Sequence, residues 1–211
     1  MVMNNKIALV TGGAKGIGRA ICRSLAEDGF KIAINFNNSE NEAIALKDEL
    51  SAVTEVEIFK CDVSDSNAVK EMFSEISQKL GSVNVLVNNA GITNNCNFID
   101  LQPEDYERVI NTNLVSMMHM SHLALPHMVD RETAIVCTAS VGGMTGVINQ
   151  ADYCAAKTGV IGLVRALALE FAPRKVRVNS IAPGMIMTDM LRGVNQDELN
   201  ALAATILRML L

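Results

Sequence analysis

Residues 11–18 read Thr11-Gly12-Gly13-Ala14-Lys15-Gly16-Ile17-Gly18, and the architecture of the chain follows from them. An apolar run at 6–10 precedes them and residues 19–28 have helical periodicity, which predicts a strand, a glycine turn and a helix. Glycines in this spacing allow a tight turn and let a diphosphate approach the amides and the positive end of the helix. The spacing differs from the commoner G-x-G-x-x-G of dinucleotide-binding turns, so an ordinary strand–helix turn is the alternative.

The alternation of strand and helix continues along the chain. Further strands are expected at 31–36, 55–60, 83–87, 134–138 and 176–181, with helices at about 39–51, 65–80, 103–129 and 151–171 and a last helix from Asp197. This pattern predicts an α/β protein with a doubly wound, Rossmann-type parallel sheet flanked by helices on both faces, in the strand order 3-2-1-4-5-6. A length of 211 residues fits a single dinucleotide-binding and catalytic domain, residues 1–211.

Composition and charge narrow the class of protein. A hydrophobic content of 49% with only 4% aromatic residues indicates an aliphatic core, as in buried parallel sheets. The net charge of −5 argues against a nucleic-acid or anionic-membrane partner. Five cysteines form no C-x-x-C pair, and we expect at least three to be buried, reduced thiols of a cytoplasmic protein. We find no signal peptide or membrane span.

Tyr153 and Lys157 stand four positions apart within a stretch that reads as helix, which puts both side chains on one helical face. A nearby ammonium would favour the ionised phenol and lower the pKa of Tyr153. Tyr153 could then donate or accept a proton. Chance alone can produce one such pair, so the interpretation needs support from other motifs.

The end of the second predicted strand bears on the choice of cofactor. It reads Asn35-Phe36-Asn37-Asn38, with no acid to hydrogen-bond the ribose 2′-hydroxyl of NAD. Lys15, inside the glycine turn, could instead meet a 2′-phosphate, which favours NADP(H), although a loop lysine is often only solvated.

Two other kinds of site are disfavoured. His119 and His122 have no further ligand of matching spacing nearby, so we predict no metal site. Ser140 lies in Ala139-Ser140-Val141-Gly142, but Thr138 stands where the hydrolase turn G-x-S-x-G needs glycine. We also expect a loop, not an immediate helix, after Ser140, which argues against a serine hydrolase.

The motifs occur together in one order, namely the glycine turn after Thr11, Asn88-Asn89-Ala90-Gly91, Asn113, Ser140, the Tyr153/Lys157 pair and Pro183-Gly184. This set resembles the short-chain dehydrogenase/reductase family almost from end to end, including the family's usual spacing between the serine and the tyrosine. Within the family, Gly91-Ile92-Thr93, residues 110–114 and residues 181–184 look most like 3-oxoacyl-[acyl-carrier-protein] reductases of fatty-acid synthesis.

The resemblance implies an NADPH-dependent reductase that converts a ketone to a secondary alcohol. Tyr153 would protonate the carbonyl oxygen, and Ser140 would hydrogen-bond it. Lys157 would lower the tyrosine pKa and hold the nicotinamide ribose, while Asn113 would hold a water that links the lysine to solvent. Asp62 and Val63 would flank the adenine, and Thr188 would touch the nicotinamide side. The full cofactor-binding set implied is Gly12, Lys15, Gly16, Ile17, Gly18, Asn37, Asp62, Val63, Asn89, Ala90, Gly91, Tyr153, Lys157, Pro183, Gly184 and Thr188.

The resemblance also bears on partners. Arg131 and Arg174 fall where these reductases carry basic residues that meet the acidic acyl carrier protein, and a homodimer or homotetramer is expected. Family members usually continue with a further helix and a seventh strand. We expect both to be missing here, which would leave residues 176–181 as an edge strand and weaken one subunit interface.

Two other functions stay open. Asn94-Asn95-Cys96 follows Thr93 where such reductases often carry an Arg-Asp pair, so another carbonyl or alcohol, such as acetoacetyl-CoA, a polyketide, a steroid or a sugar, is an alternative substrate. The other alternative is a catalytically silent NADP-binding protein. The presence of all four expected catalytic residues argues against it.

Overall fold

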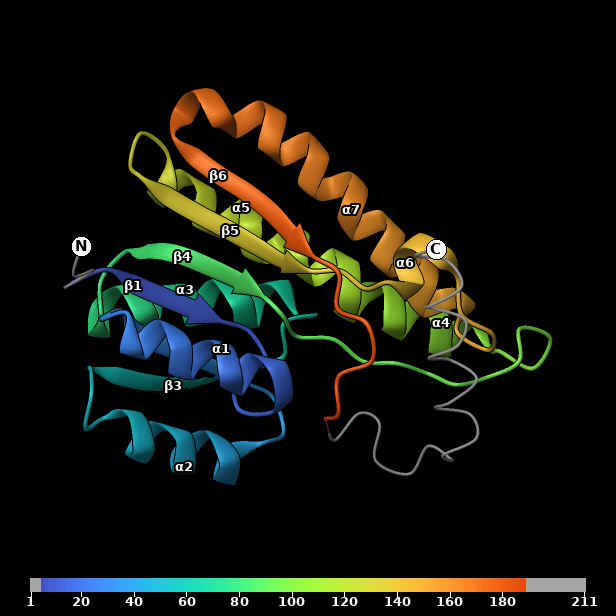
Figure 1. Ribbon diagram of the computed structural model, residues 1–211, viewed down its shortest axis with the longest axis horizontal. Coiled ribbons are helices and arrows are strands. Elements are labelled where there is room, and N and C mark those ends of the chain that lie inside the picture. The colour runs from blue at the N-terminus through green and yellow to red at the C-terminus, as the bar shows by residue number, and fades with distance from the viewer. Residues whose placement is uncertain (1–4, 189–211) are drawn as a thin grey trace.

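The sheet has six parallel strands in the computed structural model, which describes residues 5–188. Its order is β3-β2-β1-β4-β5-β6, and every neighbouring pair is parallel. The strands are β1 (Ile7–Val10), β2 (Lys31–Phe36), β3 (Val56–Lys60), β4 (Val83–Asn88), β5 (Thr133–Thr138) and β6 (Val176–Ile181). Figure 1 shows the strands pointing in one direction. The predicted fold class and strand order are confirmed.

Helices cover both faces of the sheet. They are α1 (Gly16–Glu27), α2 (Glu40–Leu50), α3 (Ser66–Lys79), α4 (Pro103–Ile110), α5 (Ser116–Met128), α6 (Gly142–Thr145) and α7 (Ala151–Phe171), followed by a 3-10 turn, η2 (Ala172–Arg174). Apolar side chains of α1 and α2 pack on one face, and those of α3, α5 and α7 pack on the other. Three cysteines are buried, Cys22, Cys61 and Cys137, as expected. No described helix is long and apolar enough to cross a membrane.

The region expected to be one helix, residues 103–129, contains a π-helical turn, η1 (Asn111–Val115), between α4 and α5. Inside this turn the Asn113 side chain donates to the carbonyl oxygen of Val109 at 2.9 Å. A regular α-helix would offer that oxygen to the backbone N–H of residue 113. Such turns frequently occur at functional sites, and this one carries an expected catalytic residue.

Two further expectations concern the segment after Ser140 and the helix from Asp197. The expectation of a loop after Ser140 is wrong, because the short helix α6 begins two residues later. Its first residue, Gly142, donates its backbone N–H to the Ser140 hydroxyl at 3.1 Å. The helix expected from Asp197 lies outside the described residues.

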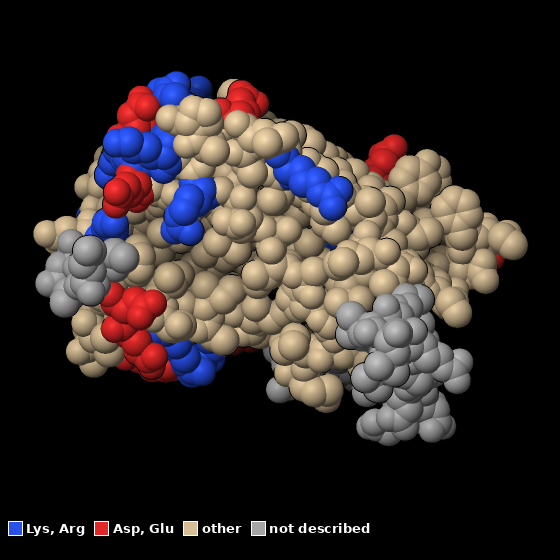
Figure 2. Space-filling model, turned by 45° about the horizontal axis from the view of Figure 1, so that its top comes forward, with Lys and Arg blue, Asp and Glu red and all other residues tan. Residues whose placement is uncertain are grey.

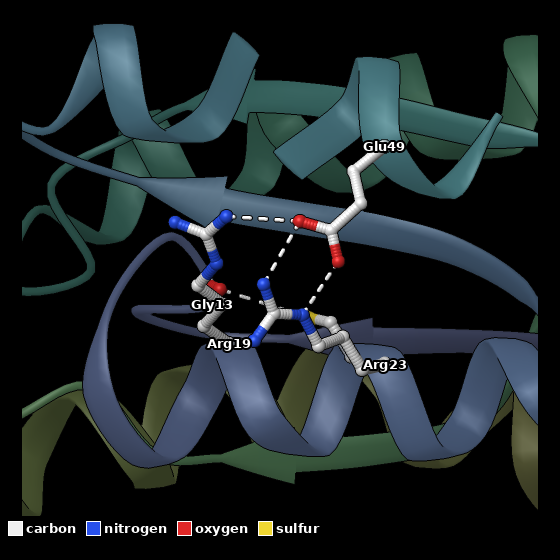
Figure 3. A network of polar contacts seen from close by, with 5 residues as sticks. Gly13, Arg19, Arg23 and Glu49 are labelled. Carbon is white, nitrogen blue, oxygen red and sulfur yellow. Dashed lines mark hydrogen bonds and ion pairs between the residues drawn. The ribbon is translucent and has the colours of Figure 1, made fainter. Parts of the chain in front are cut away.

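Ion pairs join α1 to α2 beside the glycine turn. Figure 3 shows Arg19 and Arg23 of α1 directed at Glu49 of α2, with the shortest contact at 2.6 Å between Arg23 Nε and Glu49 Oε1. Hydrogen bonds from Arg23 and then Arg19 lower the pKa of Glu49 to about 2. The two helices are thus fixed side by side next to β1 and β2.

Candidate active site

The expected site residues follow the carboxyl ends of four neighbouring strands. The glycine turn follows β1, Asn89 follows β4, Ser140 follows β5 and Pro183 follows β6. Because the strands are parallel, these points lie along one edge of the sheet, on the right in Figure 1. Ligands of open α/β sheets bind at this edge.

The glycine turn needs glycine at three positions. Gly12 and Gly16 have φ angles of 60° and 52°, in the left-handed region that side chains disfavour. A Cβ atom on Gly18 would lie 2.3 Å from the carbonyl oxygen of Gly12. Asn35 is buried beneath this turn, where its Oδ1 accepts from the Gly12 N–H at 3.3 Å. This side chain therefore supports the turn and does not face a ribose.

Thr11 joins the ends of β1 and β4. Its hydroxyl oxygen accepts from the backbone N–H groups of Asn89, at 2.8 Å, and Ala90, at 2.9 Å. The Asn89 side chain donates back to the Thr11 carbonyl oxygen at 3.0 Å. Thr11 was not among the expected site residues, because nothing in a strand-end threonine indicates which distant amides it will meet.

Lys157 is buried next to Tyr153. Its ammonium donates to the Thr138 carbonyl oxygen at 2.7 Å and lies 5.6 Å from the centroid of the Tyr153 ring. Burial lowers the pKa of Lys157 to about 8, against a smaller raising effect of Cys137. Gly143 of α6 approaches α7 closely, because a Cβ there would lie 2.7 Å from the Lys157 carbonyl carbon. Neither Thr138 nor Gly143 was among the expected site residues.

The pKa of Tyr153 is shifted in the direction opposite to that expected. Burial raises it, the side chain of Ser140 lowers it, and Cys154 raises it, with a net increase. The expectation that Lys157 lowers this pKa is wrong for the structure described, in which the ammonium is directed at the Thr138 carbonyl oxygen. Tyr153 is consequently held protonated, in the form that a proton donor requires.

Asn113 comes close to Lys157. Its side-chain amide donates to the carbonyl oxygens of Ile92 and Val109, both at 2.9 Å, while its Oδ1 is buried without a partner. A Cβ on Gly91 would lie 2.5 Å from this oxygen and 3.5 Å from Lys157 Nζ. A buried unpaired acceptor is costly, so this point favours a hydrogen-bond donor.

The ends of β2 and β3 form the corner expected to hold the adenosine. Asn37 donates to Asp62 Oδ2 at 3.0 Å, and Lys15 Nζ lies 2.7 Å from Glu42 Oε1. Burial raises the pKa of Asp62, but hydrogen bonds from Ser64 and Asn37 lower it by more. Val63 is buried in the apolar core.

The segment after β6 crosses back toward the glycine turn. The Pro183 carbonyl oxygen accepts from the Val141 N–H at 3.1 Å, which puts the segment beside the Ser140 loop. A Cβ on Gly16 would lie 3.2 Å from Thr188 Cγ2. Thr188, expected on the nicotinamide side, therefore lies against the glycine turn.

Arg131 and Arg174 lie away from these residues, before the amino ends of β5 and β6. Arg174 makes two contacts with Asp130, at 2.8 and 2.7 Å, and Arg131 donates to the His127 carbonyl oxygen at 3.0 Å. A six-residue strand such as β5 spans roughly 20 Å, and this length separates Arg131, before its amino end, from Ser140, after its carboxyl end. A cleft of about 710 Å³ at this end is lined partly by Ala168, Lys175 and Arg177, so it too is remote from Tyr153.

No group of three or more His, Cys, Asp or Glu side chains within residues 5–188 could hold a metal ion.

The buried ammonium gives a pH-dependence test with the Lys157→Met variant. Lys157 has a pKa of about 8 when folded, while a free lysine has one near 10.4, so between these values the unfolded chain binds the extra proton. The contribution of Lys157 to the free energy of unfolding should therefore rise with pH in this window.

From about pH 7.5 to pH 10, the free energy of unfolding of wild type should gain about 2 kcal/mol relative to that of the Lys157→Met variant, as measured by urea unfolding. Cys22, Cys61 and Tyr153 titrate in both proteins and cancel, while the pKa of Cys137 loses only the smaller lowering effect of Lys157. Parallel stability curves would contradict the shifted lysine.

The sequence matches a family model described as short chain dehydrogenase over residues 6–199. It is 41% identical over 196 residues to a 3-oxoacyl-[acyl-carrier-protein] reductase of Staphylococcus epidermidis, covering 92% of this chain and 80% of that protein. It is also 40% identical over 197 residues to an acetoacetyl-CoA reductase of Rhizobium meliloti, covering 93% and 80%.

Solved structures of similar fold carry related descriptions. A short chain dehydrogenase from Burkholderia cenocepacia in complex with NADP superimposes with a TM-score of 0.90 at 29% identity, covering 99% of this chain and 90% of that one. A dehydrogenase/reductase from Sinorhizobium meliloti gives a TM-score of 0.89 at 29% identity, covering 95% and 79%.

Proposed function

Because this chain belongs to the short chain dehydrogenase family, we propose that it reduces 3-oxoacyl-[acyl-carrier-protein] to 3-hydroxyacyl-[acyl-carrier-protein] with NADPH. The observation that carries this proposal is the convergence of Ser140, Tyr153, Lys157 and Asn113 beside the glycine turn. The proposal treats residues 1–211 as one dinucleotide-binding and catalytic domain. The free cysteines suit a reducing compartment such as the cytoplasm.

The residues present fit a dinucleotide. Gly12 and Gly16 present no side chain of their own at the start of α1, where helix amides favour a diphosphate. The unpaired Asn113 Oδ1 and the Lys157 ammonium both border Gly91, which supports a polar ligand at that point. The residues expected from the sequence, from Gly12 to Thr188, would hold NADPH. When bound, it supplies the hydride that reduces the carbonyl carbon.

Four side chains would handle the proton. Tyr153 would donate its phenolic proton to the carbonyl oxygen, and its raised pKa supports the protonated form beforehand. Ser140 would donate a hydrogen bond to the same oxygen. Lys157 would return a proton to the tyrosinate left after transfer, and its pKa of about 8, below the raised pKa of Tyr153, suits that exchange near neutral pH. Asn113 would hold, through its unpaired acceptor beside Gly91, a water that links Lys157 to solvent.

Apolar side chains near the site support an acyl substrate over a sugar. Phe98 is 72% exposed, Ile99 89% and Ile148 88%. Their loops are joined, because the Cys96 N–H donates to the Asn149 carbonyl oxygen at 3.0 Å. On the face seen in Figure 2, Lys, Arg, Asp and Glu gather mainly over the half with the amino ends of the strands, and the other half is sparsely charged. An apolar acyl chain that enters over this sparsely charged half would cover few charged side chains, so the cost of removing charges from water would be small.

We also propose the acidic carrier protein as the partner of Arg131 and Arg174, in a homodimer or homotetramer. Because both residues lie at the amino ends of β5 and β6, a carrier docked on them would serve the site of a neighbouring subunit more readily than the site of the same subunit.

Loss of NADPH absorbance tests the proposed function. The protein should oxidise NADPH with acetoacetyl-[acyl-carrier-protein], and more slowly with acetoacetyl-CoA. Preference for the CoA ester would favour the acetoacetyl-CoA alternative, in line with the Rhizobium meliloti relative. Turnover of only a steroid or sugar ketone would overturn the acyl assignment, and NADPH binding without any turnover would favour the silent protein.

A second test addresses the cofactor. The Lys15→Ala variant should weaken NADPH binding by about 10-fold and NADH binding by less than about 2-fold, because only NADPH carries a 2′-phosphate for the ammonium to meet. Calorimetric titration of both cofactors measures this, with Lys31→Ala as the control, an ion-paired lysine at the amino end of β2. Equal losses for both cofactors would remove Lys15 from phosphate recognition.

A further inference from the structure

Lys15 already has an anionic partner. It immediately precedes α1, and its Nζ lies 2.7 Å from Oε1 of Glu42 in the first turn of α2. The side chains of Lys15 and Glu42 are 42% and 40% exposed, so a ligand can reach both.

Two described lysines lie at this corner, Lys15 in the glycine turn and Lys60 at the end of β3, and Lys60 is 3.9 Å from Glu40. Arg19 and Arg23 are both engaged by Glu49, toward the other end of α2, as Figure 3 shows. Asn37, at the end of β2, is bonded to Asp62. A phosphate that uses the Lys15 ammonium would therefore meet Glu42 as a competing anion.

We propose that Glu42 limits the preference for NADPH by competing with the 2′-phosphate for Lys15, an inference that rests on the proposed function. The carboxylate occupies the ammonium in the free protein, and a phosphate must displace it and then remain close to it. NADH has no phosphate there and leaves the ion pair intact. Glu42 is thus a specificity-determining residue that acts through Lys15.

The competing charge persists at neutral pH. Hydrogen bonding from Lys15 and then from its own backbone N–H lowers the pKa of the Glu42 carboxyl group. Its place in the first turn of α2 adds the favourable field of a helix N-terminus. Glu42 therefore stays ionised while cofactor binds.

The test is the Glu42→Gln variant, which keeps the side-chain shape and removes the charge. Removal of the competing carboxylate should tighten the binding of NADPH and 2′,5′-ADP. Because interactions between exposed charges in water are weak, the gain should be about 3- to 10-fold. NADH and 5′-ADP should change by less than about 2-fold. Calorimetric titration with the two adenosine fragments reads the phosphate corner without turnover.

Glu40→Gln is the matched control. Glu40 begins α2 as another acid of the same turn, but its nearest cation is Lys60, at 3.9 Å. This variant removes the same helix-terminal charge without freeing Lys15, so it should leave the preference for NADPH within about 2-fold of wild type. In a Lys15→Ala background, Glu42→Gln should lose most of its effect on NADPH.

The outcomes separate the two proposals. Wild type that binds neither cofactor would overturn both. The role of Glu42 would be overturned if wild type binds and oxidises NADPH but Glu42→Gln leaves its affinity for NADPH unchanged or lowers it. The same holds if Glu42→Gln raises that affinity no more than Glu40→Gln does. In both cases the proposed function would stand.

Discussion

The Tyr153→Phe variant is expected to lose at least about 100-fold in kcat while it binds NADPH almost as wild type does. Phenylalanine keeps the ring that lies 5.6 Å from Lys157 Nζ and removes only the oxygen that would transfer the proton. A chemical loss can thereby be separated from a packing loss. NADPH oxidation measures the first and calorimetric titration of NADPH the second.

Tyr106→Phe is the matched control for this experiment. The chain has two tyrosines, and Tyr106, on α4, is 40% exposed. Its variant should keep wild-type kcat. If Tyr153→Phe retained more than a tenth of wild-type kcat, another group would have to be the proton donor.

The Gly18→Ala variant is expected to lose both stability and cofactor binding. Its Cβ would lie 2.3 Å from the Gly12 carbonyl oxygen and 2.7 Å from Asn89 Nδ2, so α1 must move away from the turn. Overpacking against backbone should lower the free energy of unfolding by about 3 kcal/mol. Displacing the start of α1 also moves the amides that would meet the diphosphate, so NADPH affinity should fall by about 100-fold or more.

The control for Gly18 is the same substitution within another helix. A Cβ added to Gly162, in α7, would have nothing within 4 Å, so Gly162→Ala should be neutral or stabilise by up to about 1 kcal/mol. Urea unfolding and NADPH titration of both variants make the comparison. A Gly18→Ala protein as stable as wild type and with unchanged affinity would show that the turn tolerates a side chain.

Strand positions could be predicted because a buried parallel strand must be apolar along its length. The strand order could be predicted because the alternation of strands and helices favours the doubly wound class, which has this order. The bounds of β2 and β6 are those expected, and those of β1, β3, β4 and β5 differ by one residue at one end. Helix ends were also read closely, since Phe171 ends α7 as expected. The π-helical turn at Asn113 was missed, because the apolar pattern continues through it while a side-chain hydrogen bond to Val109 decides the backbone.

The candidate site likewise has features that the sequence predicts and features that it does not. Four-residue spacing within one helix is enough to put Tyr153 and Lys157 on one face, and glycine spacing is enough to indicate the turn after β1. The direction of the Tyr153 pKa shift depends on burial, which outweighs the lowering effect of Ser140. The Lys157 ammonium is engaged by the Thr138 carbonyl oxygen, which belongs to β5. The pairing of Lys15 with Glu42 likewise depends on how α2 lies beside the glycine turn.

The amino-acid sequence alone determined the α/β class and the identities of the residues at the carboxyl edge of the sheet, because these follow from periodicity and from positions inside single elements. The strand order followed from the class, since doubly wound sheets usually have this order. Which of those side chains meet one another, and with what charge, was decided by tertiary structure. Contacts such as Thr11 with Asn89 or Lys157 with Thr138 join elements that packing brings together, and electrostatic interactions depend on distance and burial that no local pattern contains.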